Sequence, residues 1–374
     1  MKKIENVNIV LENKVIFGDI FYDEKITKII EKGKEKTGTP TLIAGFIDNH
    51  IHGSAGFDVM DSTIEAITGI AKSLLQEGTT SFLPTTITNS IPNKAKALKN
   101  IHTYYLHHNN YAKVLGIHLE GPFINPLKKG AQPLEFIIEP NLELFNDWQK
   151  ESGYLIKKIS LAPEMNGAYD FIKELNKQNL VTSIAHSNAT FNEVLKSTKL
   201  GLTSVTHMFN ALSPFHHRDI GATGAGLLLD ELHTELILDF IHVSKEAAKL
   251  LLKTKTPDRV IVITDSMRAK GLSDGISELG GQTVYIKDGM ATLKDGTLAG
   301  SILKMIDAFK NMLSLEISLV EISKMMSLNA AKELNLASDI GSIKEGKIAD
   351  FVLLDQDYNI IKTIVSGKTL YERK

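Results

Sequence analysis

Residues 113–120 read KVLGIHLE and are followed directly by Gly121-Pro122. The aliphatic and β-branched residues of this stretch predict a buried β-strand. A Gly-Pro pair turns the chain, so Glu120 stands where that strand ends. A carboxylate in or near a core is costly unless it is paired or bound to a cation. The stretch therefore predicts a strand that ends in a functional carboxylate, for which the rest of the sequence should supply a cation.

Similar stretches recur along the middle of the chain and alternate with helical patterns. The other candidate strands are GFIDNHIH (45–52), TTSFLPT (79–85), KKISLAP (157–163), LVTSIAH (180–186), LTSVTH (202–207), ELILDFIH (235–242) and RVIVITD (259–265). Helical periodicity lies between most of them and continues after the last one, at 62–78, 169–178, 244–254, 301–315 and 319–334. Eight strands that alternate with helices predict an α/β fold of the (β/α)8 TIM-barrel type, with a doubly wound open sheet as the alternative.

Both ends of the chain have a different character from its middle. Residues 1–40 and 349–372 consist of short stretches in which polar and apolar residues alternate, which predicts β-strands. Two β-rich ends around an alternating middle predict a small β-sandwich domain formed by both termini. A further hairpin is predicted at 282–297, where Lys287-Asp288-Gly289 supplies the turn. The barrel is predicted to span residues 45–340. Residues 1–44 and 341–374 are predicted to form the N-terminal and C-terminal parts of the small domain.

Composition narrows the class of protein. The chain has 374 residues, of which 43% are hydrophobic and 23% charged, which is typical of a globular protein with a substantial core. Its formal net charge of −2 offers no basic field for nucleic acid or an anionic membrane. It has no cysteine, so any metal must be held by His, Asp or Glu. The sequence shows neither a signal peptide nor a run of 18 apolar residues, which predicts a cytoplasmic protein with no membrane span.

Polar side chains gather at the predicted strand ends, where barrels of this class place their catalytic groups. Each has an ordinary explanation when taken alone, such as the cap of the next helix or a satisfied core histidine. Chance does not readily place such residues at the ends of six different strands, so the joint pattern indicates a site. Five of the twelve histidines lie there with two acidic residues: His50, His52, Glu120, His186, His207, His242 and Asp265.

The joint pattern supplies Glu120 with its cation. Glu120, His186 and His207 form a set of one carboxylate and two imidazoles, and three protein ligands with an open position are typical of a catalytic metal. His50 and His52 are two residues apart, which places both imidazoles on one face of a strand. They suit a second ion, which the carboxylate of Glu120 can bridge. These ligands suit a divalent Zn, Fe(II), Mn or Co, with one ion required and the second optional.

Asp265 is predicted to be the general base. A metal lowers the pKa of bound water towards neutrality and polarises a carbonyl. Asp265 is placed to take the water proton and to return it to a leaving amine, which indicates hydrolysis of an amide or a related C–N bond. His118 stands just before Glu120 in the same strand. Strand alternation is expected to turn it away from Glu120, which predicts a structural or supporting role.

These residues lie in stretches that resemble the amidohydrolase superfamily, and within it the N-acetylglucosamine-6-phosphate deacetylase family. The stretches HLEGPFINPLKKGA and THMFNA are specific to that family, whereas the H-x-H pair and GSIKEGKIADFVLLD mark the superfamily. The matching stretches cover nearly the whole chain: 44–53, 77–89, 117–132, 185–190, 206–221, 241–244, 263–267, 296–301, 329–336 and 341–355.

The resemblance implies hydrolysis of the acetamide of N-acetylglucosamine 6-phosphate to glucosamine 6-phosphate and acetate, in amino-sugar catabolism and cell-wall recycling. It implies a catalytic metal on Glu120, His186 and His207, with Asp265 as the base. It also implies a second metal in those members that keep the H-x-H pair, and a homodimer in which Arg218 reaches the phosphate held by the neighbouring subunit. Gln132 falls where some members carry histidine. The other implied substrate contacts are Asn210, Ala211, His242 and Leu298.

Three alternatives stand beside this function. The first is the galactosamine 6-phosphate epimer as substrate. The second is another metal-dependent amidohydrolase, dihydroorotase-like or acting on N-acyl amino acids. The barrel and metal set fit it equally well, but dihydroorotase-like sites usually carry a carboxylated lysine, whereas the strand here ends in Glu120. The third is a non-catalytic barrel relative. Such relatives typically lose ligands or the base, and none is missing here.

Overall fold

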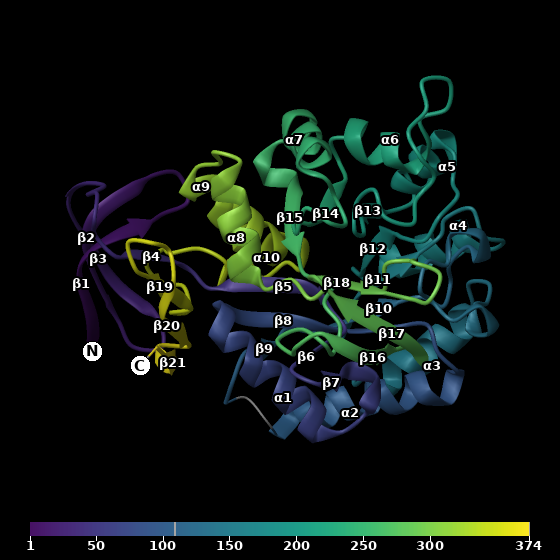
Figure 1. Cartoon of the computed structure of the whole chain (residues 1–374), viewed down its shortest axis with the longest axis horizontal. Coiled ribbons are helices and arrows are strands. Elements are labelled where there is room, and N and C mark those ends of the chain that lie inside the picture. The colour runs from purple at the N-terminus through teal and green to yellow at the C-terminus, as the bar shows by residue number, and fades with distance from the viewer. Residues whose placement is uncertain (108–109, 374) are drawn as a thin grey trace.

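The structure, a computed structural model, describes residues 1–107 and 110–373 (Figure 1). In these residues, eight parallel strands form one sheet in chain order: β5 (Phe46–Ile51), β8 (Thr79–Thr86), β10 (Ile117–Glu120), β11 (Ile156–Leu161), β12 (Val181–Ile184), β13 (Leu202–Val205), β14 (His233–Ile237) and β15 (Val260–Ile263). The first and last strands meet, because Ser266 forms a parallel bridge to Ile51. The amide of Asp265 also donates to the carbonyl of His50, at 2.8 Å. The predicted (β/α)8 barrel is confirmed, and the open-sheet alternative is wrong.

Helices follow the strands and cover the outside of the barrel (Figure 1). In α4, apolar residues recur at helical spacing, so that Phe171, Ile172 and Leu175 are buried. Capping side chains set several helix starts, as where Thr190 and Glu193 form a reciprocal capping box. The helices are α1 (Ile64–Leu74), α2 (Ile91–His107), α3 (Leu142–Glu151), α4 (Ala168–Lys177), α5 (Phe191–Thr198), α6 (Gly221–Leu228), α7 (Lys245–Thr254), α8 (Met305–Ser314), α9 (Leu319–Ser323) and α10 (Asn329–Glu333).

Two predicted strands differ from the observed ones. The stretch 113–120 forms two pieces, β9 (Lys113–Val114) and β10; β9 pairs with β8, whereas β10 lies between β8 and β11. The predicted strand 235–242 is also too long, since β14 ends at Ile237. Asp239 Oδ1 accepts hydrogen bonds from the amides of Ile241 and His242, and this turn ends the extended segment. His242 therefore lies in a loop and not on a strand.

Both termini join in a second sheet, at the left of Figure 1. Among the described residues its strands run in the order β21 (Lys368–Glu372), β20 (Ile360–Val365), β19 (Phe351–Leu354), β4 (Thr41–Ala44), β1 (Lys2–Val10), β2 (Val15–Tyr22) and β3 (Ile26–Lys34). Its inner residues, such as Ile9, Leu42 and Phe351, form a core of their own. Neighbours that face the other way, such as Ile43 and Val352, belong to the barrel core. The small β-unit predicted from both termini is confirmed, and its domain boundaries stay a prediction.

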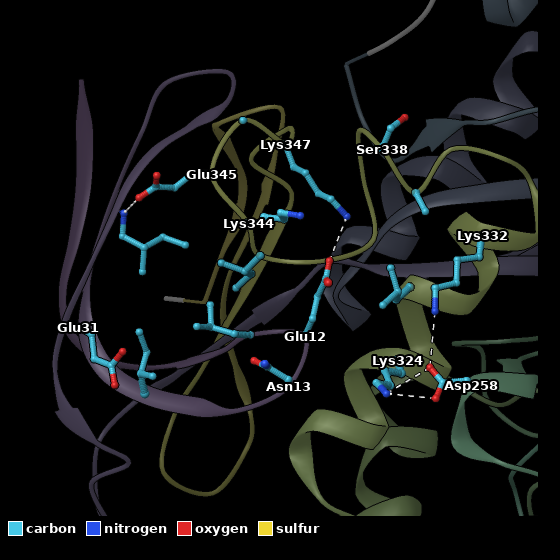
Figure 2. Close-up of a pocket in the computed structure, with 17 residues that line it drawn as sticks. Glu12, Asn13, Glu31, Asp258, Lys324, Lys332, Ser338, Lys344, Glu345 and Lys347 are labelled. Carbon is cyan, nitrogen blue, oxygen red and sulfur yellow. Dashed lines mark hydrogen bonds and ion pairs between the residues drawn. The ribbon is translucent and has the colours of Figure 1, made fainter.

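A crevice of about 1080 Å³ lies between the terminal sheet and the barrel (Figure 2). Its wall carries paired charges. Lys347 Nζ lies 3.4 Å from Glu12 Oε1, and Lys324 and Lys332 both reach Asp258, at 3.2 and 3.5 Å. These three lysines already have acidic partners within the wall, which also contains apolar residues such as Ile16 and Ile343.

A small sheet lies beyond β15: β16 (Gly275–Leu279), β17 (Gln282–Lys287) and β18 (Met290–Thr292). The predicted hairpin is confirmed, with Asp288-Gly289 as the turn between β17 and β18, while β16 was not predicted. Leu279 packs with Ile87 and Ala131 of the barrel loops. This sheet therefore forms one wall of the barrel mouth. No helix in the described parts of the chain has both the length and the hydropathy that a membrane span requires.

Candidate metal centre and substrate pocket

The predicted site residues converge at the carboxyl ends of the barrel strands. Glu120 is the last residue of β10, and His186, His207 and Asp265 each stand two residues beyond the end of a strand. These last three have left-handed backbones, with φ of 45°, 31° and 48°. Such conformations are costly for residues with a Cβ and concentrate at functional sites. The chain thus turns sharply at each strand end, which brings the side chains together over the barrel axis.

Glu120, His186 and His207 form a compact group of metal-capable atoms. Glu120 Oε1 lies 3.3 Å from His186 Nε2 and 3.2 Å from His207 Nε2, and the two nitrogens are 3.3 Å apart. Ligands at about 2.0–2.1 Å from a tetrahedral ion are separated by roughly 3.3 Å, so the spacing fits a metal with one open position.

The outer nitrogens of both imidazoles are held by backbone carbonyls. His186 Nδ1 lies 2.9 Å from the carbonyl oxygen of Lys128, and His207 Nδ1 lies 3.2 Å from that of Asn210. A carbonyl oxygen only accepts, so each Nδ1 carries a hydrogen, and each Nε2 is the nitrogen left to bind a metal. Neutral imidazoles in this tautomer are metal ligands, and the donor set therefore fits the predicted divalent ion.

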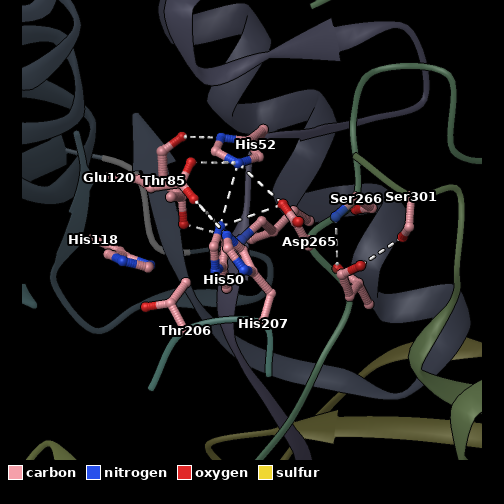
Figure 3. A network of polar contacts seen from close by, with 12 residues as sticks. His50, His52, Thr85, His118, Glu120, Thr206, His207, Asp265, Ser266 and Ser301 are labelled. Carbon is pink, nitrogen blue, oxygen red and sulfur yellow. Dashed lines mark hydrogen bonds and ion pairs between the residues drawn. The ribbon is translucent and has the colours of Figure 1, made fainter. Parts of the chain in front are cut away.

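His50, His52 and Asp265 form a second metal-capable group beside the first (Figure 3). Asp265 Oδ1 lies 3.1 Å from His52 Nε2 and 3.3 Å from His50 Nε2, and the two nitrogens are 3.3 Å apart. Glu120 Oε2 is 3.3 Å from His52 Nε2, so its carboxylate stands between both groups. Asp265, expected as a base only, thus also belongs to a group of atoms that could hold a metal ion.

The carboxylate of Glu120 and the imidazoles around it shift one another's pKa values. Burial opposes the ionisation of Glu120, but the surrounding histidines hold its pKa well below the usual range. Burial also opposes protonation of His207, but contact with Glu120 raises its pKa to about 9. Without a cation the group therefore keeps a proton at His207. A metal ion and protons compete for these atoms, so metal binding should strengthen as the pH rises.

A cavity of about 340 Å³ opens onto both groups. Gln132 turns towards the metal-capable atoms: its Nε2 donates to Glu120 Oε2 at 2.7 Å, and its Oε1 accepts from the amide of Thr88 at 2.9 Å. His242 Nδ1 is held 2.7 Å from Asp239 Oδ2. The predicted substrate residues that line the cavity are Gln132, Asn210, Ala211, His242 and Leu298.

Arg218 stands apart from this cavity. It is exposed on the loop before α6, where its guanidinium lies 2.8 Å from His217 Nε2. It lines a separate shallow hollow together with Thr190 and Phe191. The structure of one chain therefore does not bring Arg218 to the predicted site of that same chain.

The expectation for His118 was wrong. Residues two apart in a strand share a face, so His118 lies on the same side of β10 as Glu120, inside the barrel. Its ring lies beside that of His50, with the centroids 4.5 Å apart (Figure 3). Its Nε2 is 2.7 Å from Ser160 Oγ. Burial lowers its pKa well below the usual value. A neutral, hydrogen-bonded imidazole beneath the site agrees with the supporting role that was predicted.

Three buried charged residues near the site were not predicted. Lys94 Nζ donates to the carbonyl oxygens of Glu120 and Gly121, at 2.9 and 2.8 Å, and so holds the end of β10. Glu235 and Lys158 form an ion pair of 2.6 Å inside the barrel. For Lys158 and Glu235 the sequence did contain a signal. Each is a charged residue within a predicted apolar strand, KKISLAP or ELILDFIH, and such a charge needs a partner as much as Glu120 does.

A closed parallel barrel that gathers imidazoles and carboxylates at the carboxyl ends of its strands defines a barrel enzyme with a metal centre. The family model for the amidohydrolase family matches residues 41–370. The chain belongs to the amidohydrolase family, and that family implies a divalent metal.

Named relatives narrow the comparison. The chain is 41% identical over 385 aligned positions to N-acetylglucosamine-6-phosphate deacetylase of Bacillus subtilis, covering 99% of this chain and 97% of that one. It is 35% identical to N-acetylgalactosamine-6-phosphate deacetylase of Escherichia coli O157:H7, covering 87% of each. The crystal structure of N-acetylglucosamine-6-phosphate deacetylase from Thermotoga maritima aligns over 100% of both chains, with 38% identity and a TM-score of 0.93.

Proposed function

We propose that the chain hydrolyses the acetamide of N-acetylglucosamine 6-phosphate to glucosamine 6-phosphate and acetate. The observation that carries this proposal is the group Glu120, His186 and His207, which stands beside Asp265 in a pocket large enough for a sugar. The similarity to relatives of that name over nearly the whole chain supports the choice of substrate. The reaction would serve amino-sugar catabolism and cell-wall recycling.

In this proposal Glu120, His186 and His207 hold the catalytic ion, and His50 and His52 hold a second one. The bound ion would polarise the acetamide carbonyl and lower the pKa of the attacking water. Asp265 accepts the proton of that water and passes it to the amine as the C–N bond breaks. The donor set suits Zn or Fe(II), and also Mn or Co.

The loop from Asn210 to Arg218 is the proposed phosphate site. The amide N–H of Ala211 donates to no atom within residues 1–107 and 110–373, and Ala211 lines the cavity. Free amides and guanidinium groups are the usual partners of a phosphate dianion. Because Arg218 lies outside its own pocket, we assign it to the phosphate held by the second subunit of a homodimer.

An exposed apolar surface beside Arg218 supports the dimer. Phe215, Leu228 and Leu250 are 57%, 62% and 49% exposed, and they line one groove with Phe209 and Ile220. Large apolar side chains grouped on a surface are typical of an interface. A second copy that covers this groove would also be close enough to receive Arg218. We place the enzyme in the cytoplasm, where its proposed substrate would be produced.

One assay tests the proposal and its nearest alternative. The purified protein is supplied with N-acetylglucosamine 6-phosphate or with its C4 epimer, and free amine is measured together with metal content. We expect kcat/KM to be higher for the glucosamine compound. A preference for the epimer would favour the activity named for the Escherichia coli relative. Absence of amine release from both sugars, with metal bound, would refute the proposal.

A further inference from the structure

A chain of buried charges runs through the barrel interior beneath the site. Lys158 Nζ, on β11, lies 2.6 Å from Glu235 Oε1 on β14 and 2.8 Å from Glu333 Oε2 on α10. The side chains of Lys158 and Glu235 are 0% exposed and that of Glu333 is 2% exposed. Glu235 Oε2 in turn lies 3.1 Å from His50 Nδ1. Burying charges away from water costs free energy of folding, so this row of charged side chains calls for an explanation.

A metal ion is one explanation to weigh. His50, His118 and Glu235 also form a group of metal-capable atoms. However, the Lys158 ammonium already occupies Glu235, and a divalent cation placed beside it would be repelled. His118 is engaged as well, since its two nitrogens face the carbonyl of Asn49 and the hydroxyl of Ser160. Hydrogen bonds therefore account for this group better than an ion does.

One of the four histidines in the two metal-capable groups, His50, is oriented differently from the other three. His186 and His207 of the first group face backbone carbonyls. His52 likewise faces the carbonyl of Thr85, at 3.1 Å. His50 instead faces a carboxylate that is held in place by Lys158. A carboxylate partner fixes the tautomer and the ring orientation of a metal-ligating histidine.

We infer that Glu235, held by Lys158 and Glu333, is a positioning residue that keeps the hydrogen of His50 on Nδ1 and so reserves Nε2 for a second metal ion. The inference rests on the proposed metal centre. The buried charges would thus serve the second ion. The first ion does not need them, because backbone carbonyls orient its histidines, His186 and His207.

The substitution Glu235→Gln tests the tautomer directly. Lys158 is a donor, so the amide oxygen of the new side chain should face Lys158 and its NH₂ group should face His50 Nδ1. The imidazole must then accept at Nδ1 and carry its hydrogen on Nε2, which points at Asp265 and Glu120. That nitrogen has no lone pair for a metal. The variant should fold, because Lys158 keeps Glu333 as its partner.

Zn(II) binding is measured by equilibrium dialysis of metal-free protein, with bound ions per chain determined by mass spectrometry. The wild type should bind two ions. In Glu235→Gln we expect the second step to weaken by at least about 100-fold, since losing such a partner costs about 10–100-fold and the tautomer is also inverted. The first step should weaken by less than about fivefold, from loss of the 3.3 Å contact with the His207 amide.

Glu77→Gln is the matched control. Glu77 is a buried carboxylate paired with Lys270 at 2.7 Å, and it accepts from the amide of Met305 but touches no imidazole of residues 1–107 and 110–373. This variant should keep both binding steps. A second step weakened as much as in Glu235→Gln would overturn the inference, as would equal weakening of both steps in Glu235→Gln. A wild type that binds a single ion would overturn it too.

A variant that lacks all three buried charges distinguishes an effect of the His50 tautomer from an effect of altered packing. In Glu235→Gln combined with Lys158→Met and Glu333→Gln, no ammonium holds the amide oxygen, which can turn and accept from His50 Nδ1. The second ion should return to within about tenfold of wild-type affinity, because a neutral network with satisfied partners is tolerated. A folded variant that binds only the first ion would overturn the tautomer argument. Since no substrate is involved, these results do not depend on whether the sugar assay succeeds.

Discussion

Asp265→Asn separates chemistry from metal binding at this site. The amide has nearly the shape of the carboxylate and keeps an oxygen for His50 and His52, which lie 3.3 and 3.1 Å away. It is not a proton acceptor at neutral pH. Loss of general acid–base catalysis lowers kcat by roughly 10²–10⁴-fold, which corresponds to about 3–5 kcal/mol of transition-state stabilisation. We expect that loss in kcat with little change in KM.

The metal content decides how that loss is interpreted. The first group does not include Asp265, so at least one ion per chain should remain. Amine release from N-acetylglucosamine 6-phosphate and metal per chain are therefore measured on the same sample, at saturating metal. A loaded variant that keeps more than about a tenth of wild-type kcat would show that Asp265 is not the base. A variant without metal would show that Asp265 is needed for binding the ion.

Three further predictions concern metal, phosphate and pH. His186→Ala should abolish binding of the first ion, whereas His50→Ala should remove at most a second ion; the reverse pattern of metal per chain would invert the assignment. Arg218→Ala should raise KM for the phosphorylated sugar by about 10–1000-fold through a lost charge-assisted contact and barely affect the unphosphorylated sugar. Mixing it with Asp265→Asn should restore activity by forming one intact site, and no recovery despite proven subunit exchange would place Arg218 elsewhere. Burial raises the pKa of Asp58 to about 6, above an unfolded value of about 4, so the folded state binds the extra proton. Stability should therefore fall as the pH rises from about 4 to about 6, by at most roughly 3 kcal/mol. In Asp58→Asn the Tm should fall less over that range, and parallel Tm curves for the two proteins would contradict this.

The strand ends could be read from sequence because they depend on local order. An apolar run followed by Glu120 and a Gly-Pro turn places the carboxylate at a strand end whatever surrounds it. Gly121 has a φ of 58°, and a Cβ there would lie 2.1 Å from Thr88 Oγ1, so glycine is required at this turn. Once eight such strands are ordered in a barrel, their ends must meet, and the predicted residues lie together as a result.

Contacts inside the barrel could not be read in that way. Glu235 meets Lys158 across two intervening strands, and its other partner, His50, comes from β5 near the opposite end of the chain order. No spacing along the sequence encodes such a contact. The end of β14 was missed for another reason, since the Asp239 side chain competes with strand extension through local hydrogen bonds. Arg218 lies outside the cavity of its own chain, and its proposed role at the site of a second subunit stays a prediction.

The closure of the barrel sets an order in which a growing chain can build this site. Glu120, His186 and His207 all leave the ribosome before β15 does, so the first ion has its three side chains while synthesis continues. The second group is incomplete until Asp265 has emerged and its amide has paired with the carbonyl of His50. The terminal sheet can be completed only later, because β4 pairs with β19, which is synthesised after β15. A nascent chain would therefore complete the two proposed metal sites in sequence, the second one only after the first strand has met the last.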